Sequence, residues 1–523
     1  MRTQPLKFLL VVTGAIVFNF IFWNEKIGVN LILFDIFICG SVFFLFPYSL
    51  KNNLSKWLLA GHLLTAAMVV VQNTILSKIG FSITMLLFIS FSQYLHRSVW
   101  YAGGSAIMNY VYAIPNFFYE LRSLRQKRTR KTGWPRRARI LLIPFGILII
   151  FYIIYSSANT VFSQITTQIA IAFEVWLSRF FDWYSFERFG FFLLGIFVAG
   201  GLILRNRNTF FSDADLRKQN DLSRKKNNLK KWQQSPFADL VSIIAGKTVT
   251  GIMALKSELT SGIISLFLLN ILLLFINIID VKYVWLGFTF RKYSMMASYV
   301  HEGAGLLILS IFLAMFLLLF FFRGNLNFYK KNKWLRYGAY LWIIQNSFLV
   351  LSVFMRDYYY ISHFGLAYKR IGLLFFLIMV LIGLFTIFLK IYYTKTTYYL
   401  LRINAWAAIV LLIFSSLFDF DVTMAEYNLA RKSFIPLDVP FLLSLSDKTL
   451  PLIEKNKDVL RSDGRGFYYR RVYYNSAVEL FEFRKKDFLE RQKNYSWLSW
   501  NLNDNYIKEA ISTSTRSLSS NKN

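Results

Sequence analysis

The sequence has few of the residues and motifs that carry familiar chemistry. Its 523 residues include one cysteine, Cys39, which excludes an intrachain disulfide and a thiolate-rich metal site. It has no phosphate loop, no His-Glu-x-x-His and no Gly-x-Ser-x-Gly, which argues against an ATPase or a common hydrolase. The four histidines, His62, His96, His301 and His363, lie far apart, so a metal site would need different helices. We predict neither a bound metal nor a cofactor.

Apolar residues dominate the composition. Hydrophobic residues make up 55% of the chain and aromatic residues 19%, which is too apolar for a protein that presents a polar surface to water. The bilayer is therefore the expected solvent. The formal charge of +32 lies mainly in short connections between apolar runs, and no nucleic-acid module accompanies it. We expect membrane lipids, and not nucleic acid, as partners.

The apolar runs predict an all-α, polytopic transmembrane bundle of about eleven spanning helices. The first run, Met1 to Trp23, lacks a small-residue cleavage pattern and is interpreted as a retained helix. Six expected spans precede a long basic connection and five follow it. They lie at about 6–23, 30–48, 57–76, 81–97, 140–156, 188–204, 262–280, 303–322, 337–355, 371–390 and 403–420.

The basic connections predict the orientation. The most basic is Leu121 to Arg139, which we place in the cytoplasm. Alternation puts four further basic stretches on that side: Lys51–Lys56, Arg205–Lys231, Arg323–Arg336 and Lys390–Arg402. The prediction is a cell inner (cytoplasmic) membrane protein with a cytoplasmic N-terminus and an external, periplasmic C-terminal tail.

Two segments and the tail are expected not to span. Residues 236–262 mix charge with apolar residues and favour a cytoplasmic helix along the membrane. Residues 160–188 favour an outer interfacial helix, with a pair of irregular crossings as the alternative. After Asp421 charge rises, which predicts a small helical or irregular extramembrane tail. The expected divisions are 1–118 (four membrane helices), 119–139 (basic loop), 140–204 (two membrane helices), 205–261 (basic connection), 262–420 (five-helix core) and 421–523 (tail).

Polar residues at the outer ends of the last five helices form the candidate site. They share one expected depth, and ionisable groups partly withdrawn from water are functional candidates. The alternative interpretation is a ring of interfacial anchors. The predicted cluster contains Asp280, Arg291, His301, Glu302, Arg356, Asp357, His363, Arg370 and Asp419.

Other polar residues have simpler expected roles. Arg323, in an expected inner loop, is a candidate contact for lipid phosphate. The mid-membrane residues His62, Gln72, Asn270 and Gln345 are expected to bond neighbouring helices.

Four short motifs resemble those of an uncharacterised bacterial multi-pass membrane family, domain of unknown function 4173. They are Tyr299-Val300-His301-Glu302-Gly303, Arg323-Gly324-Asn325-Leu326-Asn327, Gly365-Leu366-Ala367-Tyr368-Lys369-Arg370 and Asn428-Leu429-Ala430-Arg431. The resemblance covers about Leu266 to Leu445 and departs at Ala367, where such proteins often carry Thr. It implies a bacterial envelope location and supplies no activity, cofactor or catalytic residue.

Three functions remain open. The first is handling or transport of a small ligand or ion at the outer polar cluster, which we place slightly ahead. The second is a membrane-embedded enzyme acting on lipid or envelope precursors. The third is a non-catalytic scaffold or regulatory protein whose tail docks another envelope protein. A continuous polar path would favour transport, and converging titratable groups would favour an enzyme.

Overall fold

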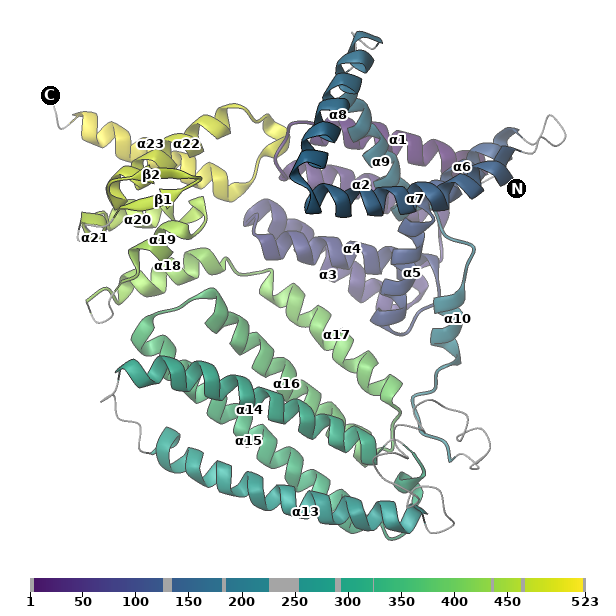
Figure 1. Cartoon of the computed structure of the whole chain (residues 1–523), viewed down its shortest axis with the longest axis vertical. Helices are drawn as coiled ribbons and strands as arrows, with labels where there is room; N and C mark the ends of the chain where they lie inside the picture. Colours follow the sequence, from purple (N-terminus) through teal and green to yellow (C-terminus); the bar gives the residue numbers. More distant parts are fainter. Residues whose placement is uncertain are drawn as a thin grey trace.

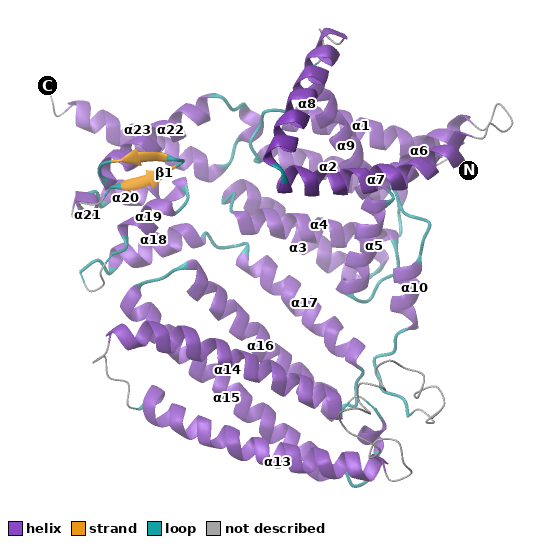
Figure 2. Cartoon of the chain, in the orientation of Figure 1, coloured by secondary structure: helices purple, strands orange, loops and turns teal. Residues whose placement is uncertain are grey.

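The computed structural model describes residues 4–125, 134–180, 185–224, 254–286, 293–322, 324–433, 437–461 and 466–520. Within these ranges the chain is helical apart from loops and one two-stranded antiparallel hairpin (Figure 2). The all-α prediction is therefore confirmed. The helices form two bundles and a smaller C-terminal unit (Figure 1).

The N-terminal bundle contains the helices before α10 that pack around one core. Four long helices are followed by two short ones and then by α9, and the closest pairs are α3 with α4 and α1 with α9. The members are α1 (Gln4–Phe22), α2 (Val29–Leu45), α3 (Asn53–Val71), α4 (Ile75–Gln93), α5 (Val99–Val111), α6 (Ala113–Arg125) and α9 (Phe186–Ile203). Their core is apolar and rich in Phe, Ile, Leu and Val.

Polar caps set the short connections between these helices. The Asn52 side chain accepts a hydrogen bond from the Leu54 N–H group and begins α3, and Thr74 accepts from Ser77 and begins α4. Such caps satisfy backbone donors that the first helical turn leaves free. Asn73, between α3 and α4, has a positive φ of 52°, which allows a three-residue reversal. Antiparallel packing of α3 on α4 follows.

Helix α7 (Trp134–Ala158) packs on α8 (Thr160–Phe180), and α8 contacts α9 and projects away from the N-terminal bundle (Figure 1). Thus residues 160–180 form one continuous helix. Chain direction then returns through α9 to the short helix α10 (Phe210–Arg217). Most of the expected cytoplasmic helix at 236–262 falls outside the described residues.

The C-terminal bundle contains four long helices: α13 (Ala254–Asp280), α14 (Tyr293–Phe321), α15 (Lys333–Phe364) and α16 (Tyr368–Tyr392). Short helical segments η3 (Val281–Trp285) and η4 (Asn325–Phe328) follow α13 and α14. A second apolar core fills the space between them. Helix α17 (Thr397–Ser415) packs on α16 and also on α4 and α5, so it joins the two bundles.

The tail, residues 420–520, has an apolar core of its own. It consists of α18 (Phe420–Ala430), α19 (Val439–Ser444), α20 (Leu450–Lys455), α21 (Asp458–Arg461), β1 (Phe467–Tyr469), β2 (Val472–Tyr474), α22 (Ala477–Lys493) and α23 (Leu502–Ser520). Residues of the tail bind the α1–α2 connection: the Val29 N–H group donates to the Trp500 carbonyl oxygen at 3.0 Å, and Lys26 pairs with Asp504 at 2.5 Å. The tail is thus attached to the N-terminal bundle.

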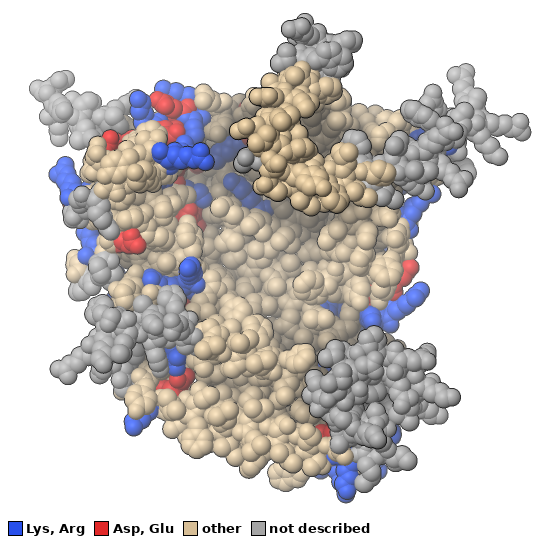
Figure 3. All heavy atoms as spheres, viewed as in Figure 1, with Lys and Arg blue, Asp and Glu red and all other residues tan. Residues whose placement is uncertain are grey.

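The helices present the chemistry of a membrane protein. Seven described helices are long and apolar enough to cross a bilayer, and shorter apolar helices occur within α1, α2, α7, α8 and α14. On the face seen in Figure 3, charged side chains gather along the left and right sides of the view, with a broad uncharged band between them. The tail lies at one end, here called the tail end, and α10 and the N-terminus lie at the opposite, α10 end (Figure 1).

Each of the eleven expected spans overlaps a helix, although the number that cross a bilayer stays a prediction. The helices α5 and α6 were not expected. With 13 residues each, both are shorter than the roughly 20 residues of a spanning helix. A length criterion therefore passes over them.

Candidate functional site

Two neighbouring helices of the N-terminal bundle bring an aspartate and a histidine together. Asp35 lies in the second turn of α2, and His62 lies in the middle of α3. The His62 Nε2 atom is 2.8 Å from Asp35 Oδ1, and the side chains are 0% and 4% exposed for His62 and Asp35. Ionisable groups so deep in an apolar bundle are functional candidates, because charge away from water is costly.

The other ring nitrogen of His62 contacts a hydroxyl group. His62 Nδ1 lies 3.1 Å from Thr84 Oγ1, which is also 2.7 Å from the Gly80 carbonyl oxygen. A hydroxyl has one proton and two lone pairs. Thr84 can therefore donate to Gly80 while it accepts from Nδ1–H. Thr65 completes the group, with its hydroxyl 3.0 Å from that of Thr84.

Cys39 is the third functional side chain of the cluster. It lies four residues after Asp35, so both face the same side of α2. Its Sγ atom donates to Asp35 Oδ1 at 3.4 Å. The reactive atoms of Asp35, Cys39 and His62 all lie within 4.8 Å of one another, and all three residues are buried. This group of three is named the α2–α3 cluster below.

Apolar side chains close the α2–α3 cluster toward the α10 end. Ile38, Leu58 and Phe88 lie one helical turn from Asp35, His62 and Thr84 in that direction, and they are 0%, 1% and 0% exposed. The Phe88 ring stacks parallel to the His62 ring, with centroids 6.4 Å apart. Cys39, which follows Ile38 on α2, belongs to the cluster itself, and these three apolar side chains offer a hydrated ion no polar partner.

Small and polar residues lie in the opposite direction, toward the tail end. Ser77 and Ser416 are buried, and a Cβ at Gly80 would lie 3.5 Å from Ser416 Cβ. At the helix ends, Asn73 Oδ1 and Gln72 Oε1 are buried without a hydrogen-bond donor among the described residues. The α2–α3 cluster therefore has a polar side and an apolar side.

A pocket of about 530 Å³ opens at the tail end of this polar side. Its lining comes from four parts of the chain: the end of α3, the α17–α18 connection, the start of α18 and α23. Gln72, Asp419, Asn503 and Tyr506 are among the lining residues. The pocket thus lies where the N-terminal bundle meets the tail, and it is called the tail-end pocket below.

Of the predicted outer residues, Asp280 and Arg356 form a buried ion pair between α13 and α15. Asp357 is also buried, and the charge of Arg370 acts on it. Arg370 donates to the Phe364 carbonyl oxygen at 2.9 Å and lies over the Tyr360 ring. These contacts hold the α15–α16 turn.

The remaining predicted outer residues either lie apart from one another or have side chains that the structure does not describe. His363 Nδ1 lies 3.0 Å from Ser362 Oγ, next to it in sequence. Asp419 caps α18 and pairs with Lys448 of the tail at 2.8 Å. The structure therefore joins Asp280 with Arg356, and it places Asp419 in the tail-end pocket. Arg291 and Arg323 lie outside the described residues, as do the side chains of His301 and Glu302.

A second buried histidine lies near the α10 end. His96 Nδ1 is 3.3 Å from Asp215 Oδ2, and His96 Nε2 is 3.0 Å from Ser105 Oγ. This order of groups is that of a hydrolase triad. Asp215 also accepts from the Arg97 N–H group at 2.7 Å and from the Tyr398 hydroxyl. Burial raises the pKa of Asp215, but these hydrogen bonds outweigh burial and hold the pKa below its usual range.

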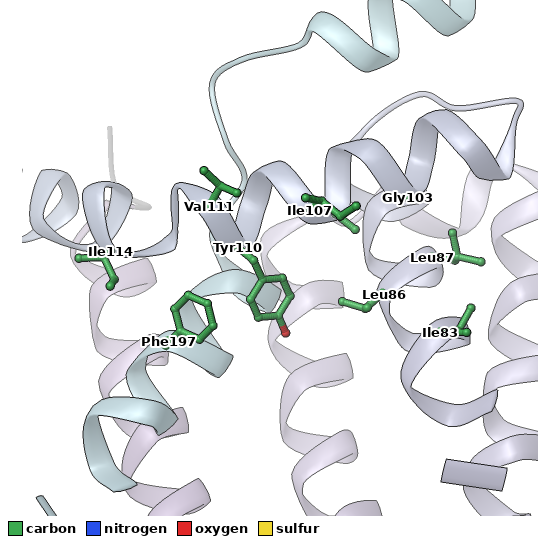
Figure 4. A pocket seen from close by; sticks show the side chains of 10 residues that line it. Ile83, Leu86, Leu87, Gly103, Ile107, Tyr110, Val111, Ile114 and Phe197 are labelled. Carbon is green, nitrogen blue, oxygen red and sulfur yellow. The ribbon is translucent and has the colours of Figure 1, made fainter. Parts of the chain in front are cut away.

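The hydroxyl of Ser105 does not face a substrate space on α5. An apolar groove of about 550 Å³ borders this helix. Its lining includes Gly103, Ile107 and Tyr110 of α5 and Phe197 of α9, with Tyr110 next to Phe197 (Figure 4). Helical geometry puts Ser105 about 160° around α5 from Gly103 and Ile107. The hydrogen bonds of His96 therefore tie α5 to α10, and Asp215 accepts in turn from Tyr398 of α17. The groove itself is lined by apolar side chains.

The comparison with known families covers most of the chain. Residues 34–456 match the model of the family described as Domain of unknown function (DUF4153). The chain belongs to this family. The expected type, an uncharacterised domain family, is right, but the number 4173 is corrected to 4153, and the match extends through the first half of the chain. No curated protein and no solved structure matches.

The expected helix-bonding roles of the mid-membrane polar residues are confirmed. His62 contacts α2 and α4, Gln72 donates to the Leu417 carbonyl oxygen at 2.6 Å, and Gln345 donates to Asn270 at 2.8 Å. Asp35 was missed. Its signal was present, because an Asp inside the apolar run at 30–48, one turn from Cys39, is unusual in a membrane helix.

Proposed function

We propose that the protein binds a small cation at the α2–α3 cluster and transports it across the membrane. The observation that carries the proposal is the mid-bundle convergence of Asp35, His62 and Cys39. An oxygen, a nitrogen and a sulfur ligand turned toward one another suit a cation, and a buried carboxylate requires a positive partner. Handling or transport of a small ligand or ion is the class placed slightly ahead from the sequence. The present proposal narrows it to a cation and places it at a different site.

The asymmetry around the cluster supports access from the tail end. On the tail-end side of the cluster, the buried residues Ser77, Ser416 and Asn73 carry side-chain oxygen atoms. The layer of Ile38, Leu58 and Phe88 supplies none on the other side. Transport requires alternating access. The apolar layer must open toward the α10 end while the polar side closes toward the tail end.

The orientation proposed from the basic connections places the α10 end in the cytoplasm and the tail outside, in a bacterial inner membrane. The cation then enters from the external side. A reporter fused near Lys331 is expected to read cytoplasmic, and one near Asp447 external. An opposite result at both positions would reverse the direction of transport without moving the site.

The predicted outer residues and partners take supporting places in this proposal. Asp419 borders the tail-end pocket and attracts cations there, although Lys448 offsets part of its charge. The outer residues Asp280, Arg291, His301, Glu302, Arg356, Asp357, His363 and Arg370 stay a proposed polar cluster that takes no part in cation binding at the α2–α3 cluster. Within it the Asp280–Arg356 pair holds α13 on α15. Lipid phosphate at Arg323 and an envelope partner on the tail stay proposals as well.

The enzyme alternative has one observation in its favour, the Asp215–His96–Ser105 hydrogen bonds. That interpretation needs a substrate at Ser105, which is 5% exposed. A fluorophosphonate probe that labels wild type but not a Ser105→Ala variant would favour a hydrolase. We expect no labelling, because the serine lies within the helix packing.

The test of transport uses the purified full-length chain in proteoliposomes. Uptake of H⁺, Na⁺, K⁺ and Zn²⁺ is measured for wild type, Asp35→Asn and Asp221→Asn. Asp221 is a matched control, because its side chain is 74% exposed and pairs with Lys395. At least one cation is expected to enter with wild type and with Asp221→Asn, but not with Asp35→Asn. If replacing Asp35 changes the uptake of none of the four cations, the proposal is contradicted.

A further inference from the structure

Resting on the proposed transport function, we propose that the cation is a divalent transition-metal ion of the zinc class. Its ligands are Asp35 Oδ1, Cys39 Sγ and His62 Nε2. These three atom types are the ones that bind Zn²⁺ in proteins. Three protein ligands also leave one position of a tetrahedral ion open, which suits an ion that must be released.

The distances between the ligand atoms are close to those that such an ion needs. Metal–ligand bonds of about 2.0 to 2.3 Å in tetrahedral geometry separate the ligand atoms by roughly 3.3 to 3.7 Å. Here Sγ and Oδ1 lie 3.4 Å apart, and Nε2 and Oδ1 lie 2.8 Å apart. The third pair, Sγ and Nε2, lies within 4.8 Å. Shifts of about 1 Å in the three side chains therefore bring the ligand atoms around one ion.

Charge favours a divalent ion at this depth. One carboxylate and one thiolate carry two negative charges, which a dication cancels, while neutral imidazole adds none. Without metal the same cluster is neutral when it holds two protons beyond the one on Nδ1: one on sulfur and one between Asp35 and His62. Binding one M²⁺ with loss of two protons therefore changes no net charge, which avoids the cost of a buried charge.

The surroundings orient the ligands as metal sites require. Metal-ligating histidines donate their second ring N–H to an oxygen. His62 has that partner in Thr84 Oγ1, 3.1 Å from Nδ1, which leaves Nε2 toward Asp35 and Cys39.

The ligand set also excludes other common cations. Calcium prefers six to eight oxygen ligands, and magnesium an octahedron of them. The α2–α3 cluster supplies one carboxylate, with a sulfur and a nitrogen that suit softer ions. Selectivity for the zinc class over alkali and alkaline-earth ions follows.

The experiment titrates the purified full-length chain with Co²⁺, a coloured substitute for Zn²⁺. Wild type is expected to bind one Co²⁺ with a thiolate-to-cobalt charge-transfer band, release two protons per ion and lose the band on addition of Zn²⁺. Cys39→Ser removes the band. Thr84→Val weakens binding about 10- to 100-fold but keeps the band. Asp221→Asn binds as wild type.

The readouts separate this inference from the transport proposal. Elution volume and thermal unfolding without metal show whether each variant is folded. Absence of the thiolate band in wild type, together with Asp35-dependent uptake of H⁺, Na⁺ or K⁺, would overturn the metal and leave transport standing. Absence of both would overturn both. A thiolate band that persists in Cys39→Ser would also overturn the assignment, because Cys39 is the only cysteine.

Discussion

The two bundles both bury charged side chains, but they neutralise them differently. In the C-terminal bundle, Asp280 pairs with Arg356, and the Lys390 ammonium donates to the Phe322 carbonyl oxygen at the end of α14. In the N-terminal bundle, Asp35 and His62 share a site with Cys39, and the buried hydroxyl residues Ser77 and Ser416 lie on its tail-end side. Burial of charge therefore does not identify a site. A site is identified by ligand atoms that converge and that can be reached from one side of the bundle.

The Asp280–Arg356 pair stabilises the C-terminal bundle in this comparison. Removal of one partner is therefore expected to have the largest effect on the stability of the folded protein. Arg356→Met leaves Asp280 as an uncompensated buried charge, which should destabilise the protein by about 3–5 kcal/mol. Adding Asp280→Leu should restore most of that loss. Thermal and denaturant unfolding of the two variants in detergent measures the difference. Equal stability of the single and double variants would show that the pair is not coupled.

Loss of a ligand in the N-terminal bundle should affect binding more than folding. His62→Gln is expected to weaken Co²⁺ binding at least about 100-fold, or about 2.7 kcal/mol, since even second-shell changes cost 10- to 100-fold. Equilibrium dialysis with the purified chain measures the affinity. An unchanged affinity would show that His62 does not bind the ion. The buried polar groups of both bundles would then be structural.

The fold was largely predictable, because each span is a local apolar run whose period and length are visible in the sequence. The site was less so. Asp35 and His62 meet across a separation of 27 residues, and the sequence does not show which helices become neighbours. Asp419 shares an expected depth with Asp280, but the tail folds over it and supplies Lys448. The expected depth of these residues in the membrane therefore predicted that they lie at one level. It did not predict which of them come into contact.

Access from the tail end can be narrowed without changing a ligand. A Cβ at Gly80 lies 3.3 Å from Thr65 Cγ2 and 3.5 Å from Ser416 Cβ. Gly80→Val should therefore slow uptake by roughly tenfold, a barrier of about 1.4 kcal/mol, with a smaller change in affinity. Gly103→Val is the control, because nothing lies within 4 Å of its Cβ. Stopped-flow uptake by proteoliposomes that shows equal rates for both would exclude this route.

The smallest effect is expected where the tail binds the N-terminal bundle. Burial raises the pKa of Asp504, but Lys26, Asn501 and Gln492 outweigh it and lower the pKa. A lowered pKa stabilises docking above the ordinary aspartate value of about 3.9, and this stabilisation is lost as pH falls through the folded value. Asp504→Asn should weaken docking by at most about 1 kcal/mol at pH 7, because Lys26 is partly exposed.

Hydrogen exchange at 496–504 measures that docking. After correction for intrinsic rates, exchange at these residues in the wild type should become faster only in strong acid. There the wild type and Asp504→Asn should exchange at the same rate. A difference that persists at low pH would contradict the ion-pair origin of docking.

The most direct test of the account compares one variant from each bundle in the same uptake assay. Asp35→Asn and the double variant Asp280→Leu/Arg356→Met are reconstituted at equal density, and Zn²⁺ uptake is followed with a dye inside the vesicles. The account predicts that Asp35→Asn abolishes uptake while the double variant keeps it near the wild-type rate. Retained uptake in Asp35→Asn with loss in the double variant would contradict it and move the site to the C-terminal bundle.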